Sequence, residues 1–273
     1  MKFLIIFLLS SSFAQAFTLN NNFGAAFNKN DVKVLIDNNT TCDPAQSGIT
    51  VYELEEIIKS AVNNFWNKVP TSALRLKPAG FGDAIPNIST GRLCAPTDDN
   101  CIDNAPAGTL IPPVKEIIIA CNNEEENFGG PSSDNVLAVT VPNNFKGSKI
   151  AGAVILINDT STVFSRLSDS DKISVIAHEI GHAIGLGHAE NKNKEALMYY
   201  RTVDLRKNLA QDDIDGVSYL YPVKGDGCGL FSGTITTDSK GPPFWQMGAT
   251  LFMMILLTEL LRLLRRPKVC SPL

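Results

Sequence analysis

Histidine is scarce in this sequence, since only three of the 273 residues are histidine. His178, His182 and His188 fall within eleven residues, which excludes a second histidine-based metal site elsewhere in the chain. Basic residues are also outnumbered, with 24 lysines and arginines against 28 aspartates and glutamates. Without Lys2 and residues 244–273, 19 basic residues face 27 acidic ones. Such an acidic surface argues against nucleic acid as a partner.

The three histidines have the spacing of a catalytic zinc site. On a helix, His178 and His182 are four residues apart and lie on one face, where both imidazoles can bind one Zn²⁺. Gly185 can take a positive φ, so the chain can leave the helix there and bring His188 back as a third ligand. Three protein ligands leave a position for water, which is typical of a catalytic zinc. Glu179 lies beside the metal and is the predicted general base.

The motif and the residues after it resemble a known family. His-Glu-x-x-His-x-x-Gly-x-x-His followed by Ala196-Leu197-Met198-Tyr199 resembles the metzincin zinc endopeptidases, with Met198 as the methionine of their Met-turn. Residues 209–221 are similar to the last helix of the matrixin subfamily. The resemblance covers residues 30–222, and it is closest over residues 170–222.

The resemblance implies a zinc metalloendopeptidase with one catalytic Zn²⁺ and with extracytoplasmic proteins or peptides as substrates. Zinc would polarise the scissile carbonyl and acidify water, while Glu179 would accept the water's proton and deliver it to the leaving amine. In matrixins an edge strand pairs with the substrate, and the resemblance implies that Leu137 and Ala138 contact the substrate through their backbones, with an ordinary edge strand as the alternative. Tyr199 and Tyr200 are candidate substrate-binding residues: either could donate to the oxyanion, although packing in the wall of the site is the commoner role of such tyrosines.

Two positions depart from the matrixin pattern and leave other functions open. Ala189 stands where matrixins usually have serine, and Tyr200 where they usually have proline. A metzincin of another subfamily is therefore one alternative, although Ala189 is not the glutamate expected of an astacin. A membrane-anchored, zinc-containing module that binds peptides without cleaving them is another. Glu179 argues against that module, which would have no chemical need of a carboxylate beside the zinc ligands.

Calcium and disulfide bonds are further expectations. Ca²⁺ is possible at Asp159 and the acidic loop 124–126, although no EF-hand or other dense carboxylate pattern is present, and a solvated loop is the alternative. An exported chain meets an oxidising compartment, where cysteines pair. Four cysteines of the domain allow three pairings, of which we favour Cys42–Cys121 and Cys94–Cys101.

The order of the elements predicts an α+β fold, that is, a metzincin-type catalytic domain with a five-stranded mixed sheet and three helices. An amphipathic helix is expected to cover the sheet. Ser168 or Ser170 is expected to cap the active-site helix. Strands are expected at 31–37, 73–76, 116–120, 136–141 and 150–157, the first and last helices at 51–68 and 209–221, and loops at 77–115 and 122–135.

The two ends of the chain predict export and anchoring. Ala14-Gln15-Ala16 is typical of a signal-peptide cleavage site. A helix over residues 244–264 would span roughly 31 Å, about one bilayer core, and the basic residues near its end predict a cytoplasmic tail. We therefore expect a signal peptide (1–16), a matrixin-like metalloprotease domain (17–222), a linker (223–243), a single transmembrane helix (244–264) and a cytoplasmic tail (265–273).

This organisation predicts a protein secreted across the membrane and held outside the cytoplasm by its single-pass helix. An amphipathic helix lying in the membrane interface is the alternative for residues 244–264. The tail also resembles bacterial C-terminal sorting signals, which favours a bacterial source.

Overall fold

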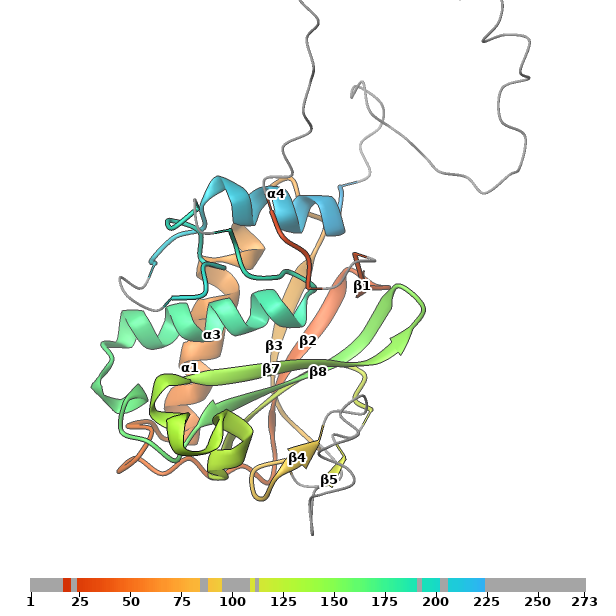
Figure 1. The fold of residues 1–273 in the computed structure, drawn as a ribbon. Helices are drawn as coiled ribbons and strands as arrows, with labels where there is room; N and C mark the ends of the chain where they lie inside the picture. Colours follow the sequence, from red (N-terminus) through yellow and green to blue (C-terminus); the bar gives the residue numbers. More distant parts are fainter. Residues whose placement is uncertain are drawn as a thin grey trace, which may run out of the picture. The chain divides into compact units, whose positions relative to one another are not determined.

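One sheet of six strands organises the structure, a computed structural model that describes residues 17–20, 24–83, 88–94, 109–110, 113–190, 193–201 and 206–223 (Figure 1). β3, β2, β6 and β8 lie side by side in that order and run parallel. β7 forms one edge, antiparallel to β8, and β1 pairs with the start of β8 on the side away from β7. The six strands are β1 (Ala26–Phe27), β2 (Asp31–Asp37), β3 (Arg75–Gly82), β6 (Ile117–Asn122), β7 (Ala138–Lys146) and β8 (Lys149–Asn158).

The predicted combination of a sheet with three helices is confirmed, but the predicted number of strands was wrong. The sheet has six strands rather than five, because Ala26–Phe27 adds a two-residue strand beside Lys149 and Ile150. It is also parallel except for β7. Neighbouring parallel strands need a crossover connection, which a helix provides between β2 and β3.

Two strand boundaries also differ from the prediction. β3 begins at Arg75 and continues to Gly82, so the first part of the expected loop at 77–115 is strand. Pro78 is tolerated there because β3 is an edge strand, where a missing N–H interrupts no ladder. β7 continues to Lys146, beyond its expected end at residue 141, and pairs with β8 as far as Lys149.

The central strands are buried on both faces. Ile117 and Ile119 of β6 belong to the larger core, which includes the helices. Ile118 and Ala120 point to the opposite face and pack in a smaller core with Phe128. Successive strand residues alternate between faces, so a run of apolar residues is expected where both faces are covered.

The described residues include three α-helices, of which α1 and α3 pack on one face of the sheet (Figure 1). Thr50 and Glu53 form a capping box at the start of α1. Ser168 caps α3, since its Oγ accepts a hydrogen bond from the N–H of Asp171. The helical segments are α1 (Val51–Asn64), α3 (Asp169–Ala183) and α4 (Gln211–Leu220), with 3-10 turns η1 (Trp66–Lys68), η2 (Glu125–Phe128), η3 (Gly130–Asn135) and η4 (Phe164–Arg166).

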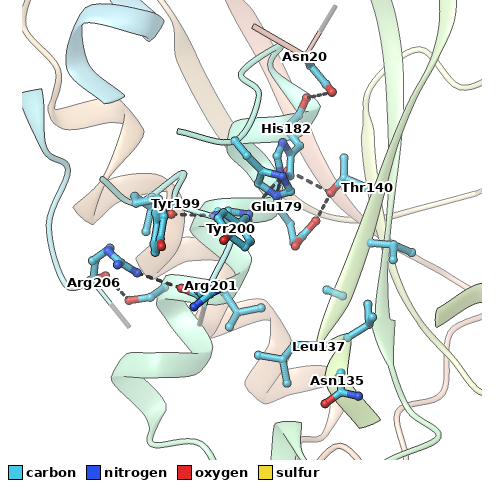
Figure 2. Close-up of a pocket in the computed structure, with 18 residues that line it drawn as sticks. Asn20, Asn135, Leu137, Thr140, Glu179, His182, Tyr199, Tyr200, Arg201 and Arg206 are labelled. Atoms are coloured by element: carbon cyan, nitrogen blue, oxygen red, sulfur yellow. Dashed lines mark hydrogen bonds between the residues drawn. The ribbon is translucent and has the colours of Figure 1, made fainter. Parts of the chain in front are cut away.

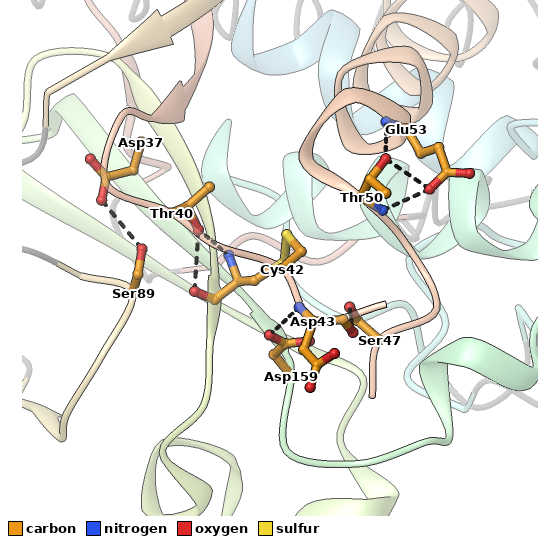
Figure 3. Close-up of a disulfide and its surroundings, with 10 residues drawn as sticks. Asp37, Thr40, Cys42, Asp43, Ser47, Thr50, Glu53, Ser89 and Asp159 are labelled. Atoms are coloured by element: carbon orange, nitrogen blue, oxygen red, sulfur yellow. Dashed lines mark hydrogen bonds between the residues drawn. A yellow bond between two sulfur atoms is a disulfide. The ribbon is translucent and has the colours of Figure 1, made fainter. Parts of the chain in front are cut away.

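The predicted disulfide between Cys42 and Cys121 is confirmed (Figure 3). It ties the loop after β2 to β6, and the hydroxyl of Thr40 accepts a hydrogen bond from the N–H of Cys121 at 2.9 Å. Cys94, in the two-residue pair of β4 (Leu93–Cys94) and β5 (Thr109–Leu110), is also disulfide-bonded. Its predicted partner, Cys101, lies outside the described residues.

The predicted signal peptide, transmembrane helix and cytoplasmic tail lie outside the described residues, as does the predicted linker apart from Val223. Among the helices of the described residues, none is long and apolar enough to cross a membrane.

Candidate metal and catalytic site

A cleft of about 490 Å³ lies between β7 and α3 (Figure 2). Residues 135–140 line it on the β7 side. On the α3 side it is lined by side chains four residues apart on one face of the helix, namely Ser174, His178 and His182, and Val175 and Glu179. The segment 197–201 and Arg206 complete its wall. All of the residues predicted to act in catalysis, metal binding or substrate binding line this cleft, except Met198, which lies beneath it.

The imidazoles of the three histidines converge in the cleft. Nε2 of His182 lies 3.1 Å from Nε2 of His178 and 3.1 Å from Nε2 of His188. Nδ1 of His178 is 2.7 Å from the carbonyl oxygen of Leu197, and Nδ1 of His182 is 2.9 Å from that of Leu186. A carbonyl oxygen can only accept, so these two Nδ1 atoms carry the protons. The corresponding Nε2 atoms therefore present lone pairs to the same point in space.

This donor set fits a zinc ion. Two nitrogens that each bind a tetrahedral zinc at about 2.0–2.1 Å lie roughly 3.3 Å apart, close to the separations found here. Burial lowers the pKa of His178 and of His182 to about 4, which keeps both imidazoles neutral, as metal binding requires. Burial also lowers the pKa of His188. Within the described part of the chain, these histidines are the one group of three or more His, Cys, Asp or Glu side chains whose ligand atoms all lie within 4.8 Å of one another.

Two glycines allow this arrangement. Gly185 has φ +111°, and a Cβ there would lie 2.2 Å from the carbonyl oxygen of Ala25. Glycine alone combines a readily adopted positive φ with the absence of a Cβ. The chain can therefore turn after α3 and bring His188 back to the other two imidazoles. A Cβ on Gly181 would lie 2.3 Å from Sδ of Met198, so the helix can approach the methionine only without a side chain.

Glu179 points its carboxylate into the cleft beside the histidines and is held by a residue that the sequence did not reveal. The hydroxyl of Thr140 donates to Oε2 of Glu179 at 2.6 Å (Figure 2). The same hydroxyl lies 3.1 Å from the backbone carbonyl oxygen of Glu179. The alternation of a strand could have pointed to Thr140. Side chains two residues apart lie on the same face, so Thr140 shares a face with Ala138, a predicted substrate-binding residue.

Comparisons with known proteins agree with this geometry. The matrixin family model matches residues 116–222, which include β6 to α4 and all residues that line the cleft except Asn20. Residues 116–222 of this chain are therefore similar to the matrixin family. Metalloendoproteinase 2-MMP of Arabidopsis thaliana is 36% identical over 88 residues, 32% of this chain and 23% of that protein. Stromelysin-1 of Rattus norvegicus is 53% identical over 51 residues, 17% of this chain and 10% of that protein. The matched segment thus spans less than a quarter of either relative.

In this matrixin-like chain, the predicted Met-turn is a tightly hydrogen-bonded segment. Met198 is 2% exposed, and its side chain lies against Gly181 of α3. The N–H groups of Leu197 and Met198 donate to the carboxylate of Asp213 at 2.7 and 3.0 Å. The carbonyl oxygen of Leu197 then meets His178, so Asp213 of α4 helps to place a histidine of the site. No local pattern in the sequence marks Asp213 as part of the site, because it lies on a helix well after the motif.

The predicted substrate-binding residues of the matrixin-like cleft divide into two kinds. The carbonyl oxygen of Leu137 accepts from the N–H of Asn158 at 3.0 Å, so this backbone group faces β8 rather than a substrate. Backbone groups alternate in direction along an antiparallel strand, so Ala138 presents its N–H and C=O to the open edge. Leu137 therefore offers the cleft its side chain, and Ala138 its backbone.

The two tyrosines also differ. Tyr199 is 8% exposed and packs in the wall, with the guanidinium carbon of Arg206 5.0 Å from its ring centroid. Tyr200 is 45% exposed, and its ring lies 6.2 Å from that of His188. Arg201 lies over the ring of Tyr200 at 5.4 Å. Neither arginine was singled out in the sequence, because nothing in the local pattern places it in the cleft.

Proposed function

We propose that this chain is a zinc-dependent metalloendopeptidase that hydrolyses peptide bonds of extracytoplasmic proteins. One observation carries the proposal: three imidazole nitrogens converge beside the carboxylate of Glu179, in a cleft bordered by the open edge of β7. His178, His182 and His188 would hold one Zn²⁺. When bound, zinc supplies Lewis acidity, which polarises a carbonyl group and acidifies water.

The chain's own residues would do the rest. The backbone of Ala138 pairs with an extended peptide, as an edge strand can, and holds it along the cleft. Glu179 accepts a proton from the attacking water at its carboxylate and later donates it to the leaving amine. Tyr200, the exposed tyrosine beside His188, would donate to the oxyanion, whereas Tyr199 packs in the wall. Met198 takes no part in proton transfer and supports the histidines from below.

Metal content and turnover of the purified full-length chain test this proposal. We expect about one zinc per chain and cleavage of a mixed peptide library. Glu179→Gln should keep the zinc but lower turnover by roughly 10²–10⁴-fold, because it removes the proton acceptor. Glu56→Gln, on the exposed surface of α1, is the matched control and should cleave like the parent. Zinc binding without cleavage of any peptide would favour the peptide-binding module instead.

Export and anchoring belong to the same proposal. We infer that residues 1–16 direct export and that residues 244–264 anchor the domain outside the cytoplasm, in a bacterial cell. Full-length protein should then stay with membranes in alkaline carbonate, which strips proteins bound only at the surface. Release by carbonate would show that residues 244–264 do not span the bilayer.

Calcium is a further part of the proposal. Asp159 is 5% exposed, and its Oδ1 atom has no hydrogen-bond partner among the described residues. Asp43 and Glu125 line the same recess, and together with Asp159 they would supply carboxylate oxygens as ligands of a Ca²⁺ ion there. The apparent melting temperature should rise when Ca²⁺ is added after chelation and should not rise in Asp159→Asn.

A further inference from the structure

Two arginines project from the segment after the Met-turn into the proposed substrate cleft. Arg201 and Arg206 line the cleft together with Ser174 and Val175, which lie one turn before His178 on α3. Figure 2 shows both arginines on the side of the cleft opposite Thr140 and Leu137. The part of the cleft beside His178 is therefore positively charged, in a chain whose overall charge is negative.

Arg206 is fixed in place while part of its guanidinium stays available. Its Nε donates to the carbonyl oxygen of Lys194, and one Nη1 hydrogen donates to that of Arg201 at 3.2 Å. The hydroxyl of Ser174 donates to the backbone carbonyl of Arg206, which ties the residue to α3. A guanidinium has five N–H donors, so most of the Nη donors remain for a ligand.

Neither arginine forms an ion pair with a carboxylate of the described residues. Asp213 lies within electrostatic reach of Arg206, but both of its oxygens accept backbone N–H groups. A second recess adjoins the arginines. Among the described residues it is lined by Lys194, Glu195, Tyr199, Arg201, Arg206, Lys207 and Asn208, which add two lysines and one carboxylate. At this end of the cleft, no carboxylate of the described residues therefore forms an ion pair with the two arginines.

The walls before the arginines are apolar. Val175 and Leu197 are each 4% exposed, and Leu137 and Tyr199 are each 8% exposed. A side chain that enters this part of the cleft passes apolar groups before it reaches the guanidinium of Arg206. Methylene groups followed by a carboxylate match that order, and a carboxylate can accept two parallel N–H bonds from a guanidinium.

We propose that Arg206 and Arg201 select peptide substrates with an acidic side chain, glutamate above all, next to the cleaved bond. The inference rests on the proposed function, since it concerns the substrate of the same cleft. The free carboxylate at the end of a peptide has the same chemistry. We commit to the side chain because the edge of β7 can hold an extended chain that continues in both directions.

Charge-matched peptides test this selectivity. The zinc-loaded full-length chain is given acetylated and amidated peptides in which one glutamate is moved through every position, and the cleaved bonds are read by mass spectrometry. At the preferred position, glutamate is then compared with glutamine, which has the same shape without the charge. We expect kcat/KM for the glutamate peptide to be roughly tenfold higher or more, as a charge-assisted hydrogen bond predicts.

Variants identify the residues responsible. Arg201→Gln/Arg206→Gln should bring the ratio of glutamate to glutamine close to one, whereas Arg206→Lys should keep part of it. Lys77→Gln, on β3 at the opposite edge of the sheet, is the control and should leave the ratio unchanged. Both peptides are measured on the same preparation, so a smaller folded fraction cancels from the ratio.

The outcomes separate this inference from the proposed function. Efficient cleavage with equal rates for both peptides, or selectivity that survives in the double arginine variant, would overturn the inference alone. Cleavage only near free carboxyl ends would assign the arginines to the chain terminus instead. If no peptide is cleaved, the proposed function fails, and the same peptide pair is compared by fluorescence anisotropy. Tighter binding of the glutamate peptide that depends on the arginines would still support the inference, and equal binding would refute it.

Discussion

Replacing Thr140 by valine removes one hydroxyl from the cleft and leaves the shape of the side chain almost unchanged. That hydroxyl donates to Oε2 of Glu179 at 2.6 Å, and the residue lies on β7, where valine is at least as well tolerated as threonine. We therefore expect the variant to fold and to bind zinc like the parent. The carboxylate of Glu179 would lose the bond that orients it.

The size of the effect follows from the charge on Glu179. A hydrogen bond to a charged group contributes about 1.5–3 kcal/mol, which corresponds to roughly 10- to 150-fold in rate if the bond is needed in the transition state. The loss should fall mainly on kcat, because Thr140 orients the proton acceptor rather than holding the peptide. Thr140→Ser keeps the hydroxyl and should recover most of the activity.

Steady-state kinetics on zinc-loaded protein provide the assay, with zinc content measured on each sample. Thr71→Val is the matched control, because the Thr71 hydroxyl lies 2.6 Å from that of Ser218, outside the residues that line the cleft. Turnover of Thr140→Val within twofold of the parent would refute the reasoning. Equal losses in Thr140→Val and Thr140→Ser would also refute it, since packing rather than the hydroxyl would then be responsible.

Three further predictions concern stability. Replacing Cys42 and Cys121 together by serine should lower the free energy of unfolding, measured in urea, by about 2–5 kcal/mol, because the disulfide links residues 79 positions apart and restricts the unfolded chain. Equal urea midpoints for the variant and the parent would contradict this. Burial and the neighbouring carboxylates raise the pKa of Asp212 to about 6, so the folded state favours its protonated form, and stability is lost as pH rises toward and through 6. Asp212→Asn should therefore raise the melting temperature at pH 8 more than at pH 4, and a pH-independent change would argue against this cause. Gly181→Ala should destabilise the fold by roughly 1–3 kcal/mol in urea, because its Cβ would collide with Met198; an unchanged midpoint would show that the methionine moves aside at little cost.

The parts of the site that the sequence predicted are those set by local spacing. His178 and His182 follow from the period of one helix, and Gly185 from the need to leave it. β6 was recognisable because an apolar run indicates a strand buried on both faces. The short strand at Ala26–Phe27 was not, since two residues carry no period, and its pairing with β8 is decided by tertiary contacts.

The residues that the sequence did not reveal act across long separations. Thr140 meets Glu179 over 39 residues, and Asp213 reaches back 15 residues to Met198. Arg206 reaches the cleft because its carbonyl and guanidinium bind groups 32 and 12 residues away. No period or motif encodes such contacts, because each depends on how two separate elements pack.

One chain of hydrogen bonds links Asp213 to the proposed metal site. Asp213 of α4 accepts from the N–H of Leu197, and the carbonyl oxygen of Leu197 accepts from Nδ1 of His178. The proton on Nδ1 is what leaves Nε2 free to bind metal, so α4 helps to decide the tautomer of a residue on α3. The same segment continues to Arg201, so the placement of His178 and the charge of the cleft depend on one loop. Substitutions in this loop that would change substrate preference are therefore constrained, because they must preserve the histidine geometry that zinc requires.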